Sequence, residues 1–94
     1  MTLLSDAEIE QRLATTGEWR RRERDSIVRE LKLADFAGAI AFVNQVAELA
    51  EQANHHPDIL VHGWNRVRLT LSTHSEGGLT DADFELAARI DRLA

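Results

Sequence analysis

Apolar and polar side chains alternate without a break along residues 66–72. The apolar members are Val67, Leu69 and Leu71, and the residues between them are arginine, threonine and serine. Because successive side chains of a strand point to opposite faces of a sheet, this pattern predicts a strand with one buried face and one polar face. Antiparallel sheets accommodate such strands, whereas parallel sheets are usually buried on both faces.

Three helices and three further strands are predicted around this strand. The helices should begin at Ser5, Asp35 and Thr80, since each of these side chains can cap a helix. Ser5 and Thr80 are also followed three positions later by an acidic residue, as in a capping box. The expected helices span residues 5–14, 36–53 and 80 to nearly the end, and the expected strands span 19–25, 27–33 and 59–61.

The longest predicted helix carries a wide apolar stripe. Its members recur at helical spacing and are Phe36, Ile40, Val43, Ala47 and Ala50, widened by Phe42, Val46 and Leu49. A stripe this wide can face the sheet on one side and a partner subunit on the other, although core packing alone explains most of it.

The predicted order is helix-strand-strand-helix-strand-strand-helix. Strands in hairpin-like pairs indicate an α+β fold, with a four-stranded antiparallel sheet and three helices packed on one face. Residues 1–94 contain no linker, repeat or low-complexity segment, so they are predicted to form one domain.

Composition excludes several functional classes. A net charge of −5 argues against direct nucleic-acid binding, which depends on lysine and arginine contacts to phosphates. The absence of cysteine excludes disulfides and thiolate chemistry. Four arginines between residues 20 and 24 fit a solvated edge strand better than an anion site. No apolar run approaches the ~20 residues of a membrane span, and the acidic N-terminus does not resemble a signal peptide, so a cytoplasmic location is expected.

All four histidines lie between residues 51 and 83, and three of them are candidate site residues. These three are His55, His56 and His74, and histidine both gives and takes protons near neutral pH. Pro57 biases His56 toward an extended backbone, so the two adjacent histidines should point in different directions. If the last two strands pair as predicted, His74 lies near both of them.

Two carboxylates accompany these histidines. Glu51 lies four residues before His55, hence on the same face if the helix continues. Asp83 falls in the first turn of the last helix and can enter from the adjoining loop. Without further context, Asp83 is more simply a helix cap, whereas Glu51 fits a solvated helix residue and a site residue equally well. His62 is expected to be structural or exposed in a turn.

The spacing of these residues resembles that of the pterin-4a-carbinolamine dehydratase family. The pattern runs Glu51-x3-His55-His56-Pro57, then six residues to Trp64, nine to His74 and eight to Asp83. The likeness extends over residues 19–91. Some members have five residues where this chain has six before Trp64, which puts the hairpin turn in doubt.

The resemblance implies a fold, an activity and a site. Such proteins share the α+β fold, form homodimers or homotetramers, and need no metal or organic cofactor, because the pterin is the substrate. They are hydro-lyases that dehydrate 4a-hydroxytetrahydrobiopterin in tetrahydrobiopterin recycling, so a pterin-dependent hydroxylase would be the pathway partner. The family's catalytic residues fall on His55, His56 and His74, with Glu51 and Asp83 as supporting carboxylates.

Each residue can be given a hypothetical role in this chemistry. His55 and His74 would act as general acids on the 4a-hydroxyl, and His56 would orient or deprotonate the substrate. Glu51 would hold His55, and Asp83 would support the pocket near His74. Trp64 fits the pterin pocket and the core equally well.

Two other classes of function stay open. The three histidines with Glu51 could form a metal site, although adjacent extended histidines that point apart suit a single metal poorly. The chain could also be a protein-interaction module. Some family members act as dimerisation cofactors of a homeodomain transcription factor, through a helical surface.

Overall fold

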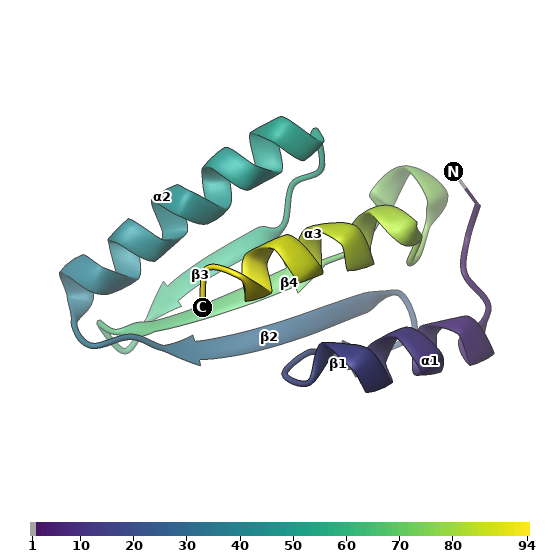
Figure 1. The fold of residues 1–94 in the computed structure, drawn as a ribbon, viewed down its shortest axis with the longest axis horizontal. Coiled ribbons are helices and arrows are strands. Elements are labelled where there is room, and N and C mark those ends of the chain that lie inside the picture. Colours follow the sequence, from purple (N-terminus) through teal and green to yellow (C-terminus); the bar gives the residue numbers. More distant parts are fainter. Residues whose placement is uncertain (1) are drawn as a thin grey trace.

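The computed structural model describes residues 2–94, and three helices cover one face of a four-stranded sheet (Figure 1). The predicted α+β class and element order are confirmed. Within residues 2–94, no helix is both long and apolar enough to span a bilayer. The elements are α1 (Asp6–Thr16), β1 (Arg20–Arg22), β2 (Ser26–Lys32), α2 (Phe36–Ala53), β3 (Asp58–His62), β4 (Arg66–Leu71), the 3-10 turn η1 (His74–Glu76) and α3 (Asp81–Asp91).

The sheet is antiparallel throughout, in the order β1-β2-β4-β3. The long strands β2 and β4 form its centre, and β3 returns along β4 as a hairpin. Asp58 pairs with Thr70 at the last register position of this hairpin. The start of β3 therefore lies beside the end of β4, so the chain around Pro57 meets the chain around His74.

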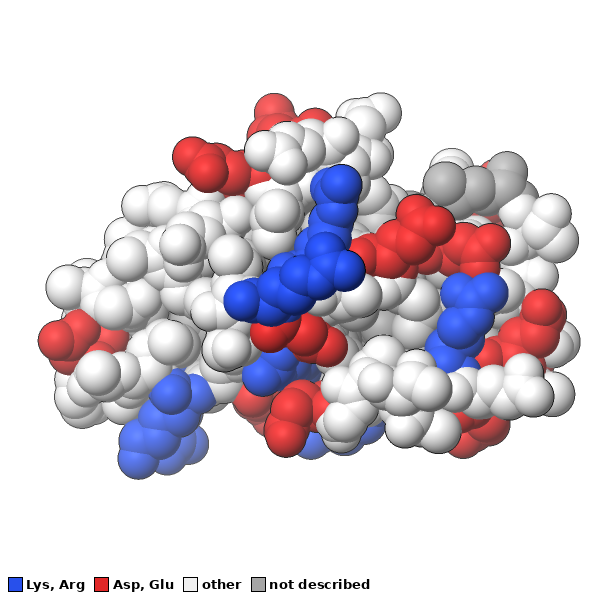
Figure 2. Space-filling model, in the orientation of Figure 1, with Lys and Arg blue, Asp and Glu red and all other residues white. Residues whose placement is uncertain are grey.

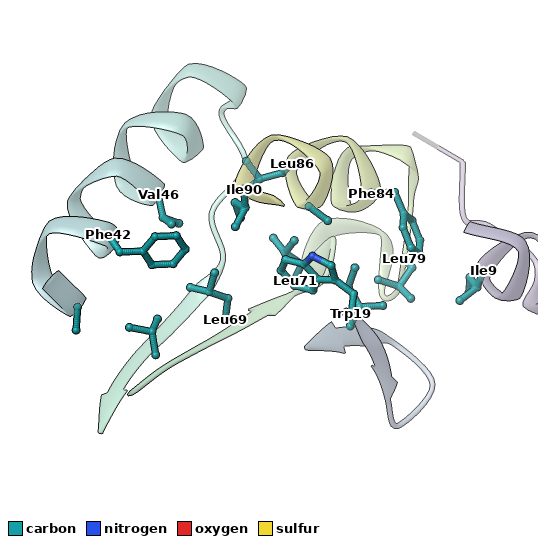
Figure 3. Packing of buried hydrophobic residues seen from close by; sticks show 14 residues of the cluster. Ile9, Trp19, Phe42, Val46, Leu69, Leu71, Leu79, Phe84, Leu86 and Ile90 are labelled. Carbon is teal, nitrogen blue, oxygen red and sulfur yellow. The ribbon is translucent and has the colours of Figure 1, made fainter. Parts of the chain in front are cut away.

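The alternation along β4 divides the sheet into two different faces. Val67, Leu69 and Leu71 have no exposed surface and pack beneath the helices with residues such as Phe42 and Ile90 (Figure 3). The side chains between them belong to the opposite face, which the three helices leave uncovered. The predicted buried and polar faces are thus confirmed, and the polar face is open to ligands.

The buried stripe of α2 differs from the predicted one. The residues that face the sheet are Ala39, Phe42, Val46 and Ala50. By contrast, the side chains of Phe36 and Ile40 are 55% and 37% exposed. The apolar stripe is wider than the contact with one sheet, so periodicity alone could not decide which part of it is buried. The surface over α2 carries few charged side chains (Figure 2).

The predicted helix caps are present. Ser5 and Glu8 form a reciprocal capping box on α1, with nitrogen–oxygen distances of 2.9 and 3.2 Å. Asp35 accepts a hydrogen bond from the Gly38 amide at 2.7 Å and begins α2. A second capping box at Thr80 begins α3. These local interactions explain why the sequence located the helix starts correctly.

Arg29 lies on the helix-covered face, where it interrupts the apolar series of β2. Its Nη1 atom lies 2.5 Å from Oδ1 of Asp91, and the indole N–H of Trp19 donates to the same oxygen at 2.8 Å. The side chains of Arg29 and Asp91 are only 13% and 27% exposed. This group fastens the end of α3 to the sheet and compensates for the partly buried charge.

Replacing Asp91 by alanine should lower the free energy of unfolding by about 2 kcal/mol, because the Arg29 guanidinium would lose its counter-charge in a mostly buried position. Chemical denaturation measures this change. Arg24→Gln is the matched control, since its guanidinium is 88% exposed and 3.6 Å from Asp6; the change there should stay below about 0.5 kcal/mol. Equal effects of the two substitutions would contradict the role of Asp91.

Candidate active site

The C-terminus of α2 determines where His55 lies. Asn54 adopts the left-handed conformation, with a φ of 50°, and ends the helix. Asparagine is one of the few residues other than glycine that tolerate this conformation. The amide of His55 donates to the carbonyl of Ala50 at 3.1 Å. The chain then leaves the helical layer and reaches Pro57 and β3.

His55 forms a buried dyad with Asp83. Its Nε2 atom lies 2.6 Å from Oδ1 of Asp83, whose side chain has no exposed surface. The other carboxylate oxygen, Oδ2, accepts hydrogen bonds from the Thr73 hydroxyl at 2.8 Å and the Thr80 amide at 2.9 Å. Because a carboxylate oxygen accepts hydrogen bonds, Nε2 of His55 is the donor in this contact. Asp83 thereby fixes the tautomer of His55.

The hydroxyl groups extend this dyad into a network. The Thr73 and Thr80 hydroxyl oxygens lie 2.8 Å apart. Since the single hydroxyl hydrogen of Thr73 is directed to Asp83, the Thr80 hydroxyl donates to Thr73. All three side chains are buried. Buried networks whose members are satisfied are rigid, so this one ties together the end of β4, the start of α3 and the corner after α2.

His56 points to a different helix from His55. Its Nε2 atom is hydrogen-bonded to Oε2 of Glu51, and both side chains lie largely in solvent. The two adjacent histidines therefore diverge, as the extended backbone predicted.

The predicted partner of His55 was wrong. We expected Glu51 to hold His55, whereas Glu51 contacts His56 and Asp83 contacts His55. The four-residue spacing of Glu51 and His55 aligns their side chains only if the helix continues through His55. The left-handed cap at Asn54 ends it first.

His74 begins the 3-10 turn η1. The segment is closed by hydrogen bonds from the Thr73 amide to the Gly78 carbonyl at 2.8 Å and from the Gly77 amide to the Thr73 carbonyl at 3.0 Å. Gly77 has a φ of 74°, which favours glycine. The side chain of His74 is exposed and forms no hydrogen bond within residues 2–94, so it is available to a ligand.

A cavity of about 390 Å³ lies next to His74. Much of its wall comes from the polar face of the sheet, and Asp58, two residues after His56, lies at its β3 side. Its lining residues include His74, Ser72, Thr70, Arg68, Asp58, Arg22 and Asp25. The cavity thus lies between the end of β4 and the start of β3, and neither His55 nor His56 is among its lining residues.

An ion pair holds Arg68 in the wall of this cavity. Its Nε atom donates to Oε1 of Glu30 at 3.2 Å. This hydrogen bond is the main reason that the pKa of Glu30 lies below its ordinary value, and Arg20 adds to the effect. Glu30 therefore remains ionised under mildly acidic conditions and keeps the guanidinium in place.

Two other sequence candidates lie away from this site. Trp64 is 62% exposed in the turn between β3 and β4, at the opposite end of β3 from His56. The structure does not bring Trp64 to His55, His56 or His74. His62 lies at the same end, with Nε2 3.7 Å from Glu30.

Sequence reasoning missed Thr73 as a member of the network. A signal existed, because Thr73 continues the buried series of Val67, Leu69 and Leu71 with a polar side chain. A polar residue in such a position needs a hydrogen-bond partner, and that partner is Asp83.

Within residues 2–94, no group of three or more histidine, aspartate and glutamate side chains is placed to hold a metal ion. Nε2 of each corner histidine is engaged by a carboxylate instead. The metal interpretation therefore finds no support in the geometry.

Solved structures with the same fold include two pterin dehydratase-like proteins. The crystal structure of a transcriptional coactivator/pterin dehydratase from Brucella melitensis superposes with a TM-score of 0.93, at 35% identity over 99% of each chain. A pterin dehydratase-like protein identified as a RuBisCO assembly factor in the alpha-carboxysome gives a TM-score of 0.70, at 29% identity over 82% of this chain and 89% of the other. The fold and the histidine corner thus define a protein of the pterin dehydratase class.

Sequence comparisons identify the family itself. Residues 2–93 match the family model described as pterin 4 alpha carbinolamine dehydratase. A relative from Chloroflexus aggregans is 53% identical over 99% of this chain and 98% of its own, and one from Roseiflexus castenholzii is 53% identical over 97% and 96%. Both are named provisionally as pterin-4-alpha-carbinolamine dehydratases. The chain belongs to the pterin 4 alpha carbinolamine dehydratase family.

Asp83→Asn should lower the free energy of unfolding by about 2–3 kcal/mol. The substitution replaces one carboxylate oxygen by an NH2 group, which cannot accept the hydrogen bonds made there. Thermal or urea unfolding gives the value. Glu85→Gln, at an exposed position two residues later, is the control and should change stability by less than about 0.5 kcal/mol. An Asp83 variant as stable as this control would show that the network is dispensable.

Proposed function

We propose that this protein is a hydro-lyase that converts a 4a-hydroxytetrahydropterin into quinonoid dihydropterin and water. The observation that carries the proposal is the cavity beside His74, which reaches Asp58 next to the His56 corner. Membership of the family supports a pterin as the substrate. The proposal invokes no metal and no organic cofactor.

The reaction needs an acid and a base at neighbouring atoms. The C4a–oxygen bond breaks and the hydroxyl leaves as water after accepting a proton. The nitrogen at position 5 loses its proton, and its electrons form the C4a–N5 double bond, so no oxidant or reductant is required. Positioned side chains contribute about 10²–10⁴-fold each to such transfers. Histidine suits both roles.

The geometry favours His74 and His56 for the proton transfers. His74 lines the cavity and has no hydrogen-bond partner among residues 2–94, and His56 is exposed with Glu51 to orient it. His55 is only 13% exposed and is bound to Asp83, which favours a positioning role over the acid role that its sequence suggested. This assignment explains why adjacent histidines can serve different purposes.

His74→Ala and His56→Ala should each lower kcat/KM for dehydration by about 10²–10⁴-fold, because each removes one proton-transfer group. Ultraviolet absorbance of freshly generated 4a-hydroxytetrahydropterin measures the rate. His62→Ala, at the far end of β3, is the control and should retain wild-type activity. The proposal fails if both site variants retain full activity, or if the folded wild type gives no acceleration.

Self-association is the second functional property that we propose. Phe36 and Ile40 are exposed on α2, and the surface over this helix carries few charged side chains (Figure 2). This surface supports the predicted homodimer or homotetramer. It also fits a protein-interaction role, in line with the coactivator and assembly factor named among the structural neighbours. The hydroxylase partner and the cytoplasmic location remain predictions.

A Phe36→Glu/Ile40→Glu double variant should dissociate the oligomer, because two charges would be buried in the contact. Light scattering coupled to size exclusion gives the mass. Leu3→Glu, a charge placed at an exposed apolar residue outside α2, is the control and should leave the mass unchanged. A wild-type protein that is already monomeric would contradict the proposal.

A further inference from the structure

The proton transfers leave the carboxylates that line the cavity without a role, and these belong to Asp58, Asp25 and Glu23. Asp58 lines the cavity together with His74 and Ser72. Within the described chain, its side chain forms no hydrogen bond or ion pair. The carboxylate is therefore free to accept hydrogen bonds from a ligand.

The position of Asp58 is fixed by the sheet. Asp58 is the first residue of β3 and pairs directly with Thr70 of β4. Directly paired residues share one face of a sheet, and Thr70 also lines the cavity. His56 lies two residues earlier, so the two Cα atoms are no more than about 7 Å apart. A carboxylate and a proton-transfer group thus lie within the length of one small ring system.

A pterin presents a pair of hydrogen-bond donors that matches this carboxylate. The 2-amino group and N3–H of the pyrimidine ring point in the same direction, as the donors of a guanidinium do. Carboxylates accept such pairs in bidentate fashion, and the geometry confers specificity. C2 and the reacting C4a lie at opposite corners of the same six-membered ring. A carboxylate at the C2 edge therefore leaves C4a directed toward the histidines.

We propose that Asp58 binds the 2-amino and N3–H edge of the substrate, and so selects 2-amino-4-oxopteridines over 2,4-dioxopteridines. The inference rests on the proposed function, since it assumes that the pterin occupies this cavity. A 2-oxo group would direct its lone pairs at the carboxylate, which would lose one hydrogen bond and gain repulsion.

Asp25 is the other aspartate in this cavity, and it makes a matched comparison. It precedes β2 in the turn after β1, and its main-chain carbonyl accepts a hydrogen bond from the Ser72 hydroxyl at 2.6 Å. Strand residues hold a ligand more precisely than turn residues. Asp58 is also the aspartate next to the His56 corner. These two arguments favour Asp58.

Calorimetric binding of two stable analogues tests the inference. The probes are 6-(1,2-dihydroxypropyl)-7,8-dihydropterin and its counterpart with oxygen in place of the 2-amino group. Wild type should bind the 2-amino compound on the order of tenfold to a hundredfold more tightly. Asp58→Asn should reduce this ratio to within about threefold, because an amide can pair with either analogue. Asp25→Asn should keep the wild-type ratio.

The outcomes separate this inference from the function on which it rests. Wild type that binds neither analogue would overturn the proposed pterin site, and the role of Asp58 with it. Equal binding of both analogues by wild type would overturn the selection alone, as would a ratio that survives in Asp58→Asn or is lost only in Asp25→Asn. In dehydration kinetics, Asp58→Asn should raise KM about tenfold or more with kcat changed only a few-fold, the signature of lost ground-state binding.

Discussion

The buried carboxylate of Asp83 connects the parts of this protein on which the candidate site depends. One oxygen pairs with His55, and the other accepts hydrogen bonds from the Thr73 hydroxyl and the Thr80 amide. These partners come from the corner after α2, the end of β4 and the start of α3. An unpaired carboxylate at a position without exposed surface would be costly, so the three segments are stable only when they are together.

The two faces of the sheet give the protein separate places for folding and for function. Val67, Leu69 and Leu71 contribute to the core on the covered face, whereas the cavity beside His74 opens toward the polar face. His55 joins the buried network and His56 remains in solvent, because the chain between α2 and β3 is extended at the His-His-Pro corner. A rigid support and a reactive group therefore lie side by side in the sequence.

The buried network and the outer surface of α2 are separate parts of this chain. The proposed dehydratase chemistry and the proposed self-association therefore place their demands on different residues. The structural neighbours named as a coactivator/dehydratase and as an assembly factor fit such a division. In this chain, the cavity retains His74 together with free carboxylates, which supports small-molecule chemistry over a purely structural role.

Sequence by itself determined the features that depend on local interactions. The capping residues Ser5, Asp35 and Thr80 located the helix starts, and alternation along β4 predicted its buried face. The family spacing predicted that His55, His56 and His74 belong to one site. Only the tertiary structure decided which carboxylate pairs with which histidine, which part of the α2 stripe is buried and that Trp64 lies at the far end of β3. These features depend on how the elements rotate and pack against one another, which long-range contacts set and periodicity does not encode.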